Sequence, residues 1–251
     1  MTPPPDRAPT PQSGPSVIGL IKRDIGRAVR DAADGDAFRR EVEAATGFPL
    51  RIASGDDEAR LTFRGVASGG DVRGRVAVLD VGGGSTELAL GVDGHVVGAA
   101  SAQAGSVRAT ERWLGEGRVR ASALVEARRA LDELLASAIP DALVERLDAG
   151  VAVAATATIL AALDLGLAAH DRAAVDGHVL HALAVEALVL RLAALDLDAR
   201  GALGPVGRDR AGVIAGGALV LAAALRRAGL DAVRVSTRDV LDGIALAAAD
   251  G

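Results

Sequence analysis

The chain has 251 residues, of which 50% are hydrophobic and 24% are charged, and its formal net charge is −5. This composition excludes a generally disordered chain, and the acidic balance argues against a DNA-binding protein. The absence of cysteine excludes disulfides, thiolate metal sites and cysteine nucleophiles, and it favours a cytoplasmic location. The longest apolar run, 211–225, is shorter than the roughly 20 residues of a membrane-spanning helix, so we expect no membrane association.

The first part of the chain changes character after its proline-rich start. Residues 1–15 hold six of the nine prolines, which lack an amide proton and fix φ, so a disordered tail is predicted. The elements expected next are a helix over 36–46, a strand over 50–53, a helix over 58–64 and a glycine-bearing linker over 68–74.

Three apolar segments follow the linker and are joined by turn residues. Strands are predicted over 75–80, 86–92 and 95–101. The glycine-rich run 82–85 separates the first two strands, and Asp93 with Gly94 forms a favoured two-residue hairpin turn between the last two. An antiparallel meander is therefore predicted.

The rest of the chain is predicted to be mostly helical. The apolar spacing predicts helices over 121–138, 156–165, 179–195, 209–228 and 237–248. Short apolar runs predict strands over 151–155 and 232–236. This order of strands and helices predicts a layered α/β domain.

The sharpest motif is the run 80–87, which lies between the first two strands of the meander. Consecutive glycines are costly in backbone entropy, and they suit a loop whose amides approach an anion closely. The residues that could hold phosphate in this way are Gly82, Gly83, Gly84, Ser85 and Thr86. Asp80 could hold Mg²⁺ beside that phosphate, and Glu87 opens the next strand from the same loop. The alternative is a flexible hairpin loop, and the loop is not a P-loop because it lacks the lysine.

Two further segments carry residues of chemical interest, each with a simpler alternative. The acids Asp56, Asp57 and Glu58 repel one another, which could produce a general base, although a solvated helix N-terminus explains them as well. Thr156 lies between a predicted strand and a helix, where its hydroxyl either caps the helix or binds an anion, and capping is the simpler interpretation. The four histidines show no metal-binding spacing.

Several motifs taken in order resemble the exopolyphosphatase/guanosine pentaphosphate phosphohydrolase (Ppx/GppA) family. Residues 80–88 match the family pattern Asp-x-Gly-Gly-Gly-Ser-Thr-Glu-Leu without a departure. Similar segments, each matching a further motif of the family, lie at 54–61, 105–111, 154–160 and 236–244. The glycine-rich loop alone is shared with other actin-like phosphotransferases, whereas the ordered set is specific.

The resemblance implies an actin-like, ribonuclease-H-type α/β fold with two lobes. It also implies Mg²⁺-dependent hydrolysis of phosphoanhydride bonds, releasing orthophosphate from polyphosphate or guanosine pentaphosphate. Glu58 would be the base that activates water, Asp80 would hold the metal, and Glu87 would support the water or the metal. The run 82–86, together with Thr156, would bind phosphate.

The chain also departs from the family pattern. No Asp-x-Gly-Ser-Asn-Ser loop of the first lobe is present, so we expect 16–73 to be a remnant of that lobe and 74–251 to be a complete second lobe. Ala155 replaces the glycine of the motif at 154–160. The alternative functions are therefore a catalytically impaired phosphate- or nucleotide-binding remnant and, less favoured, an actin-like kinase or ATPase fragment. A missing lobe exposes apolar surface, which favours a homodimer.

Overall fold

The computed structural model describes residues 35–47, 53–70 and 72–250. The predicted tail at 1–15 lies outside the described residues, as does the predicted strand at 50–53 except for Ala53, which belongs to no helix or strand.

One six-stranded mixed sheet organises the described part of the chain, in the order β3-β2-β1-β4-β6-β5. The pairs β1–β2, β2–β3 and β5–β6 are antiparallel, whereas β1–β4 and β4–β6 are parallel. The strand bounds are β1 Arg75–Val81, β2 Thr86–Val92, β3 His95–Ala102, β4 Ala149–Val153, β5 Val179–His181 and β6 Ala232–Val235. Because β1, β4 and β6 run in parallel, their carboxyl ends meet at one edge of the sheet.

The predicted meander is confirmed, and its hairpin turn has the expected backbone. Asp93 and Gly94 have φ angles of 48° and 83°, the pair of positive values that a tight type I′ turn requires. The register between β2 and β3 shifts by one residue between Leu90 and Gly91. This β-bulge decides which residues lie opposite one another farther along the hairpin.

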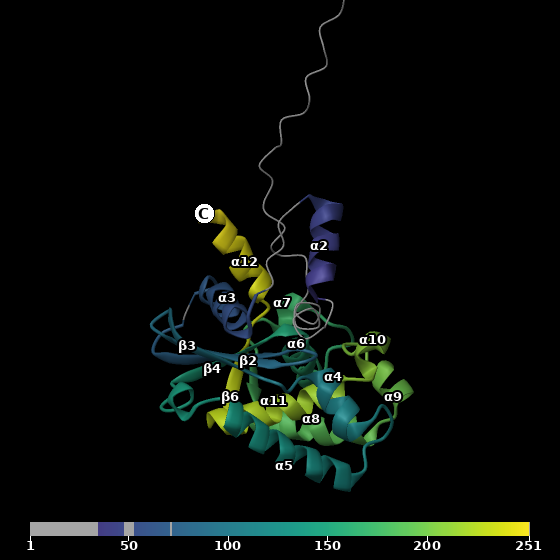
Figure 1. Cartoon of the computed structure of the whole chain (residues 1–251). Coiled ribbons are helices and arrows are strands. Elements are labelled where there is room, and N and C mark those ends of the chain that lie inside the picture. Colours follow the sequence, from purple (N-terminus) through teal and green to yellow (C-terminus); the bar gives the residue numbers. More distant parts are fainter. Residues whose placement is uncertain (1–34, 48–52, 71, 251) are drawn as a thin grey trace, which may run out of the picture.

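Helices cover both faces of the sheet (Figure 1). The longer helices are α2 Gly35–Thr46, α3 Gly55–Ala67, α5 Ala121–Ala138, α6 Ala154–Asp164, α8 Ala182–Ala194, α11 Ile214–Ala228 and α12 Val240–Ala249. The short ones are α4 Ser106–Ala109, the π-helix η1 Thr110–Leu114, the 3-10 helix η2 Asp141–Leu143, α7 Arg172–Val175, α9 Leu197–Gly201 and α10 Gly207–Ala211. Helices α3 and α12 lie on one side of the sheet, and α5, α8 and α11 lie on the other.

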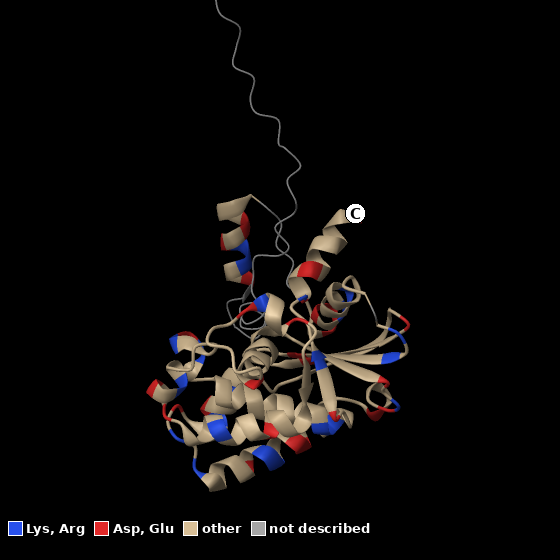
Figure 2. Ribbon diagram, turned by 180° about the vertical axis from the view of Figure 1, so that it is seen from behind, with Lys and Arg blue, Asp and Glu red and all other residues tan. Residues whose placement is uncertain are grey.

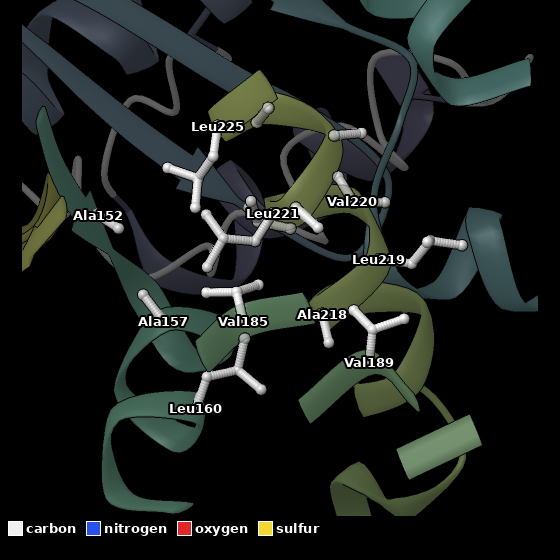
Figure 3. Close-up of a cluster of buried hydrophobic side chains, with 14 of the residues drawn as sticks. Ala152, Ala157, Leu160, Val185, Val189, Ala218, Leu219, Val220, Leu221 and Leu225 are labelled. Carbon is white, nitrogen blue, oxygen red and sulfur yellow. The ribbon is translucent and has the colours of Figure 1, made fainter. Parts of the chain in front are cut away.

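The larger hydrophobic core lies on the α11 side of the sheet. In β1, Ala77 and Leu79 belong to this core, whereas the alternate residues Val76 and Val78 belong to the smaller core under α3, as the two-residue period of a strand requires. Every residue of helix α11 from Ile214 to Leu225 is buried, and the helix packs against other helices and against β1. Figure 3 shows its leucines among side chains of α6 and α8.

The smaller core depends on two close approaches of α3. The ring of Phe63 occupies the space beside Gly91 of β2, where an added Cβ would lie 1.9 Å from the ring. Helix α12 crosses α3 at glycines, since a Cβ on Gly65 would lie 2.1 Å from the Asp239 carbonyl oxygen. No side chain separates the two helices at this crossing.

Three predicted elements were wrong in detail. Residues 179–181, predicted as helix, form the edge strand β5, because hydrogen bonding to β6 outweighs the helical spacing. The predicted helix at 209–228 is broken at Gly212 and Val213 into α10 and α11, as a glycine inside a helix favours. The strand predicted to reach residue 155 ends at Val153, and Ala154 already begins α6.

The charged side chain of Arg200 is fully buried. The Arg200 guanidinium donates to the carbonyl oxygens of Leu192 at 2.8 Å, Gly117 at 2.6 Å, Glu116 at 3.1 Å and Ala211 at 3.4 Å, and it is 0% exposed. Burial lowers the pKa of Arg200, and the charge of Asp196 opposes that shift. Arg200 therefore fixes the end of α10.

Many other charged residues lie on the surface, where Figure 2 shows both signs interspersed along the outer helices. Among the described helices, none is long and apolar enough to cross a membrane.

Candidate active site

The predicted acidic residues of the glycine-rich motif lie side by side on the sheet. Asp80 of β1 is the register partner of Glu87 of β2, and Glu87 is in turn the partner of Ser101 of β3. Directly opposite residues on antiparallel strands project from the same face with Cβ atoms about 5 Å apart. Asp80 is 1% exposed and Glu87 2%. The sheet therefore buries two neighbouring carboxylates on one face.

Ser101 is a site residue that the sequence did not reveal. Its hydroxyl donates to Glu87 Oε1 at 2.9 Å, which fixes the orientation of that carboxylate. A hairpin without a bulge would place Ala100 opposite Glu87, because Val92 pairs with His95. The bulge at Leu90 and Gly91 moves Ser101 into that position. No feature of the sequence signals this shift.

Glu58 reaches the same face of the sheet from α3. Ser54 caps α3, and the reciprocal bonds between Ser54 and Asp57 form a capping box. Asp57 therefore serves the helix terminus, as the simpler interpretation of the acidic run held, whereas Glu58 is buried at 7% exposure. A Cβ on Gly55 would lie 2.8 Å from Ser101 Cβ, so the first turn of α3 lies against the strand that supports Glu87.

Helix α4 holds the glycine-rich loop through hydrogen bonds from its backbone and from the side chain of Arg108. The Gly82 carbonyl accepts from Ser106 N at 2.9 Å, and the Gly83 carbonyl accepts from Val107 N at 2.9 Å. The Gly84 carbonyl accepts from Arg108 Nε at 3.1 Å. With its carbonyls directed at α4, the loop has a defined shape for receiving an anion.

The hydroxyl side chains near the loop differ in their surroundings. Thr86 is fully buried and donates to the Ala104 carbonyl at 2.5 Å, so its proton has a partner inside the protein. Thr156 donates to the Val81 carbonyl at 3.1 Å and joins the start of α6 to the end of β1. Ser85 is buried within the loop. Phosphate binding by Thr86 and Thr156 stays a prediction.

A pocket of about 430 Å³ lies at the carboxyl ends of β4 and β6. Strand β4 is the neighbour of β1, which leads into the glycine-rich loop. Its wall includes the turn after β4, where Ala154 has a φ of 69° that alanine rarely adopts. The family pattern has a glycine at position 155, where this chain has Ala155. The residue with the positive φ is instead Ala154, one position before it. The pocket also contains His170, Arg172 and Arg210, which sequence reasoning missed because they follow no motif.

The acidic pair fits the predicted magnesium ion. Mg²⁺ prefers oxygen ligands and is commonly held by one or two carboxylates together with waters and substrate phosphates. Asp80 and Glu87 provide such a pair beside a loop suited to phosphate. Within residues 35–47, 53–70 and 72–250, no group of three or more histidine or acidic side chains could hold a metal by itself. The carboxylates therefore suit an ion that shares its coordination with substrate.

Buried carboxylates beside a glycine-rich loop at the carboxyl edge of a mixed sheet suit an enzyme of phosphoryl-transfer chemistry. The sequence model of the Ppx/GppA phosphatase family matches residues 26–250. The chain belongs to this family, and the resemblance predicted from its motifs is confirmed.

Similar proteins agree with this assignment. Exopolyphosphatase 2 of Mycobacterium tuberculosis is 38% identical over 234 residues, which cover 88% of this chain and 72% of that protein. Exopolyphosphatase 1 of Mycobacterium leprae is 33% identical over 227 residues, covering 87% and 65% of the two chains. Both proteins are longer than this chain.

Solved structures share the fold. An exopolyphosphatase-like protein of 32% identity superposes with a TM-score of 0.80, covering 87% of this chain and 74% of that one. The Aquifex aeolicus PPX-GPPA enzyme, 24% identical, superposes with a TM-score of 0.77 over 88% and 72% of the two chains. The predicted α/β class is therefore confirmed, whereas the division into a complete second lobe and a partial first lobe stays a prediction.

Proposed function

We propose that the chain is an exopolyphosphatase, which hydrolyses the terminal phosphoanhydride bond of polyphosphate in a Mg²⁺-dependent reaction. The observation that carries the proposal is the buried acidic row of Asp80 and Glu87, braced by Ser101 and faced by the helix that bears Glu58. The names of the similar exopolyphosphatases support polyphosphate as the substrate. Guanosine pentaphosphate presents the same type of bond and is the alternative substrate.

Each part of the site has a separate task. The run 82–86 receives the terminal phosphate, held in shape by α4. Asp80 would hold Mg²⁺, which when bound neutralises phosphate charge. Glu87, oriented by Ser101, supports the ion or the attacking water. In-line displacement depends on positioning and charge neutralisation, which these residues supply.

Glu58 acts as the general base in this proposal. A water attacks the terminal phosphorus and the bond from that phosphorus to the bridging oxygen breaks. The shortened polyphosphate leaves with the bridging oxygen, and the attacked phosphorus becomes orthophosphate. The proton of the water passes to the Glu58 carboxylate. Its burial at the first turn of α3 keeps the group in a fixed place on the face that carries Asp80 and Glu87.

The test is phosphate release from polyphosphate with Mg²⁺ by the wild-type chain and two variants. Glu58→Gln should lower kcat about 10³-fold, because general-base catalysis typically contributes 10²- to 10⁴-fold. Asp56→Asn is the matched control, since Asp56 is an exposed acid of the same first turn, and it should stay within about twofold. Chelation of Mg²⁺ should abolish release. Equal activities of wild type and Glu58→Gln would contradict the assignment.

A second candidate is a phosphate-binding protein with impaired catalysis. It is favoured by Ala154, whose strained φ and methyl group lie in the wall of the pocket. Polyphosphate binding by the wild type without phosphate release would select this candidate. The homodimer, the cytoplasmic location and the lobe boundaries stay predictions.

A further inference from the structure

The side chain of Arg108 has no task of its own in the reaction proposed above. We propose that Arg108 is a positioning residue, whose guanidinium holds the Gly84 carbonyl so that the next amide, that of Ser85, faces the reacting phosphate. This inference rests on the proposed function, because it takes the loop at 82–86 as the seat of that phosphate. Arg108 acts through the loop and does not itself contact the substrate.

The carbonyls of the loop show which way its amides point. The peptide bonds of the loop are trans, and a trans peptide directs its C=O and the following N–H to opposite sides. The Gly82 carbonyl accepts from Ser106 N and the Gly83 carbonyl from Val107 N, both at 2.9 Å. The amides of Gly83 and Gly84 are therefore directed away from α4.

The peptide between Gly84 and Ser85 is oriented by a side chain instead. The Gly84 carbonyl accepts from Arg108 Nε at 3.1 Å, so the Ser85 amide points away from that guanidinium. The two preceding carbonyls are held by backbone N–H groups, which any residue except proline supplies. The third bond needs a donor at one atom of one side chain. The direction of the Ser85 amide therefore depends on Arg108.

The amides of Gly84 and Ser85 are open to an anion. Within the part of the chain that the structure describes, neither N–H donates a hydrogen bond. Ser85 is 7% exposed, and an unpaired amide at a buried residue is costly unless an outside acceptor satisfies it. Successive N–H groups that converge in this way form a nest for an anion. A phosphate oxygen is the acceptor that this nest fits.

The charge of Arg108 strengthens the same amide. A guanidinium that donates to a carbonyl polarises the peptide, and the following N–H becomes a stronger donor. Arg108 is exposed, so its replacement leaves neither a cavity in the core nor a buried charge. A change at Arg108 therefore alters the loop with little effect on packing.

Two variants separate the hydrogen bond of Arg108 from its charge. Arg108→Met removes both the donor and the charge at a similar side-chain length. Arg108→Lys keeps the charge, but lysine has a methylene, Cε, where arginine has the donating Nε. The matched control is Arg112→Met, because Arg112 is an exposed arginine of η1 whose guanidinium lies over the Trp113 ring, 5.0 Å from its centre.

The amide resonances of the loop provide the first measurement, with inorganic phosphate and Mg²⁺ as the probe. In the wild type, saturating phosphate should shift the N–H resonances of Gly84 and Ser85 downfield, because both gain an acceptor. In both Arg108 variants the Gly84 shift should persist, since the backbone of α4 still holds that peptide, whereas the Ser85 shift should disappear. Arg112→Met should match the wild type. A general loss of structure would instead affect both amides.

Phosphate affinity and turnover provide the second measurement. Both Arg108 variants should raise the Kd for orthophosphate and lower kcat/KM for polyphosphate about tenfold, the effect of one charge-assisted hydrogen bond. Arg112→Met should change either quantity less than about twofold, because an exposed charge is screened.

Wild-type behaviour of Arg108→Lys beside a defective Arg108→Met would overturn the inference, because charge alone would then suffice. An equal loss of the Gly84 and Ser85 shifts would overturn it too, as would a wild-type Ser85 amide that does not respond to phosphate. The two proposals fail separately. A wild type whose Ser85 shift depends on Arg108 but which releases no phosphate contradicts only the exopolyphosphatase assignment, and full phosphate release by both Arg108 variants contradicts only the role of Arg108.

Discussion

Two turns at the same edge of the sheet differ sharply in how they are held. The loop after β1 is tied to α4 by backbone bonds from Gly82 and Gly83, and its neighbouring acids are buried. The turn after β4 instead opens onto a pocket, holds Ala154 in a left-handed conformation and faces cationic side chains. The difference shows that backbone hydrogen bonds hold one turn in a single shape, whereas the other turn borders open space.

The largest effect is expected at Gly105, which lies against the fixed loop. A Cβ there would lie 2.3 Å from the Gly83 carbonyl oxygen, a backbone atom that cannot move without distorting the loop. Gly105→Ala should therefore destabilise the fold by about 3 kcal/mol, at the upper end of overpacking costs, and abolish phosphate release.

The control for this change is Gly117→Ala, where an added Cβ meets nothing within 4 Å. Thermal unfolding and phosphate release measure both variants. A Gly105→Ala protein with wild-type stability and activity would show that the loop is not held as described.

A smaller effect is expected at Thr156, which joins the two turns. Thr156→Val keeps the shape of the side chain but removes the bond to the Val81 carbonyl, at a cost of about 1.5 kcal/mol. Thr156→Ser keeps the hydroxyl and should cost less. Denaturant unfolding separates the two. If valine and serine behave alike, the bond does not couple the turns.

The smallest effect, and the only gain, is expected at Ala154. Glycine adopts a φ of 69° without strain, so Ala154→Gly should stabilise the protein by about 1 kcal/mol. Ala155→Gly is the comparison, because residue 155 has no positive φ and lies in α6, where glycine costs about 1 kcal/mol. Opposite shifts in Tm are therefore expected, and shifts of the same sign would contradict the strain at Ala154.

Local signals predicted much of the fold. The spacing of apolar residues gave the bounds of α5 correctly, and the Asp93 and Gly94 pair predicted the hairpin with its positive φ angles. The segment 179–181 was misassigned because its strand character comes from pairing with β6, more than 50 residues away along the chain. Pairing over such a separation leaves no periodic pattern in the sequence.

The candidate site also contains residues that local sequence signals predict and residues that depend on distant parts of the chain. Asp80, Glu87 and the glycines between them belong to one contiguous motif, so the sequence sufficed to find them. Ser101 depends on a bulge elsewhere in the hairpin, and Arg210 depends on a broken helix that Arg200 anchors. Both required the three-dimensional arrangement, because neither position follows from spacing.

The side-chain-free crossing of α3 and α12 has a mechanical consequence. Asp239, which lines the pocket, has its carbonyl against Gly65 of α3, and Gly243 lies against the Leu61 carbonyl. Two helices whose backbones are in direct contact move together, because no flexible side chain separates them. Glu58 lies in the first turn of the same helix α3. A tilt of α12 at the pocket would therefore also move the helix that bears Glu58, the residue proposed as the general base.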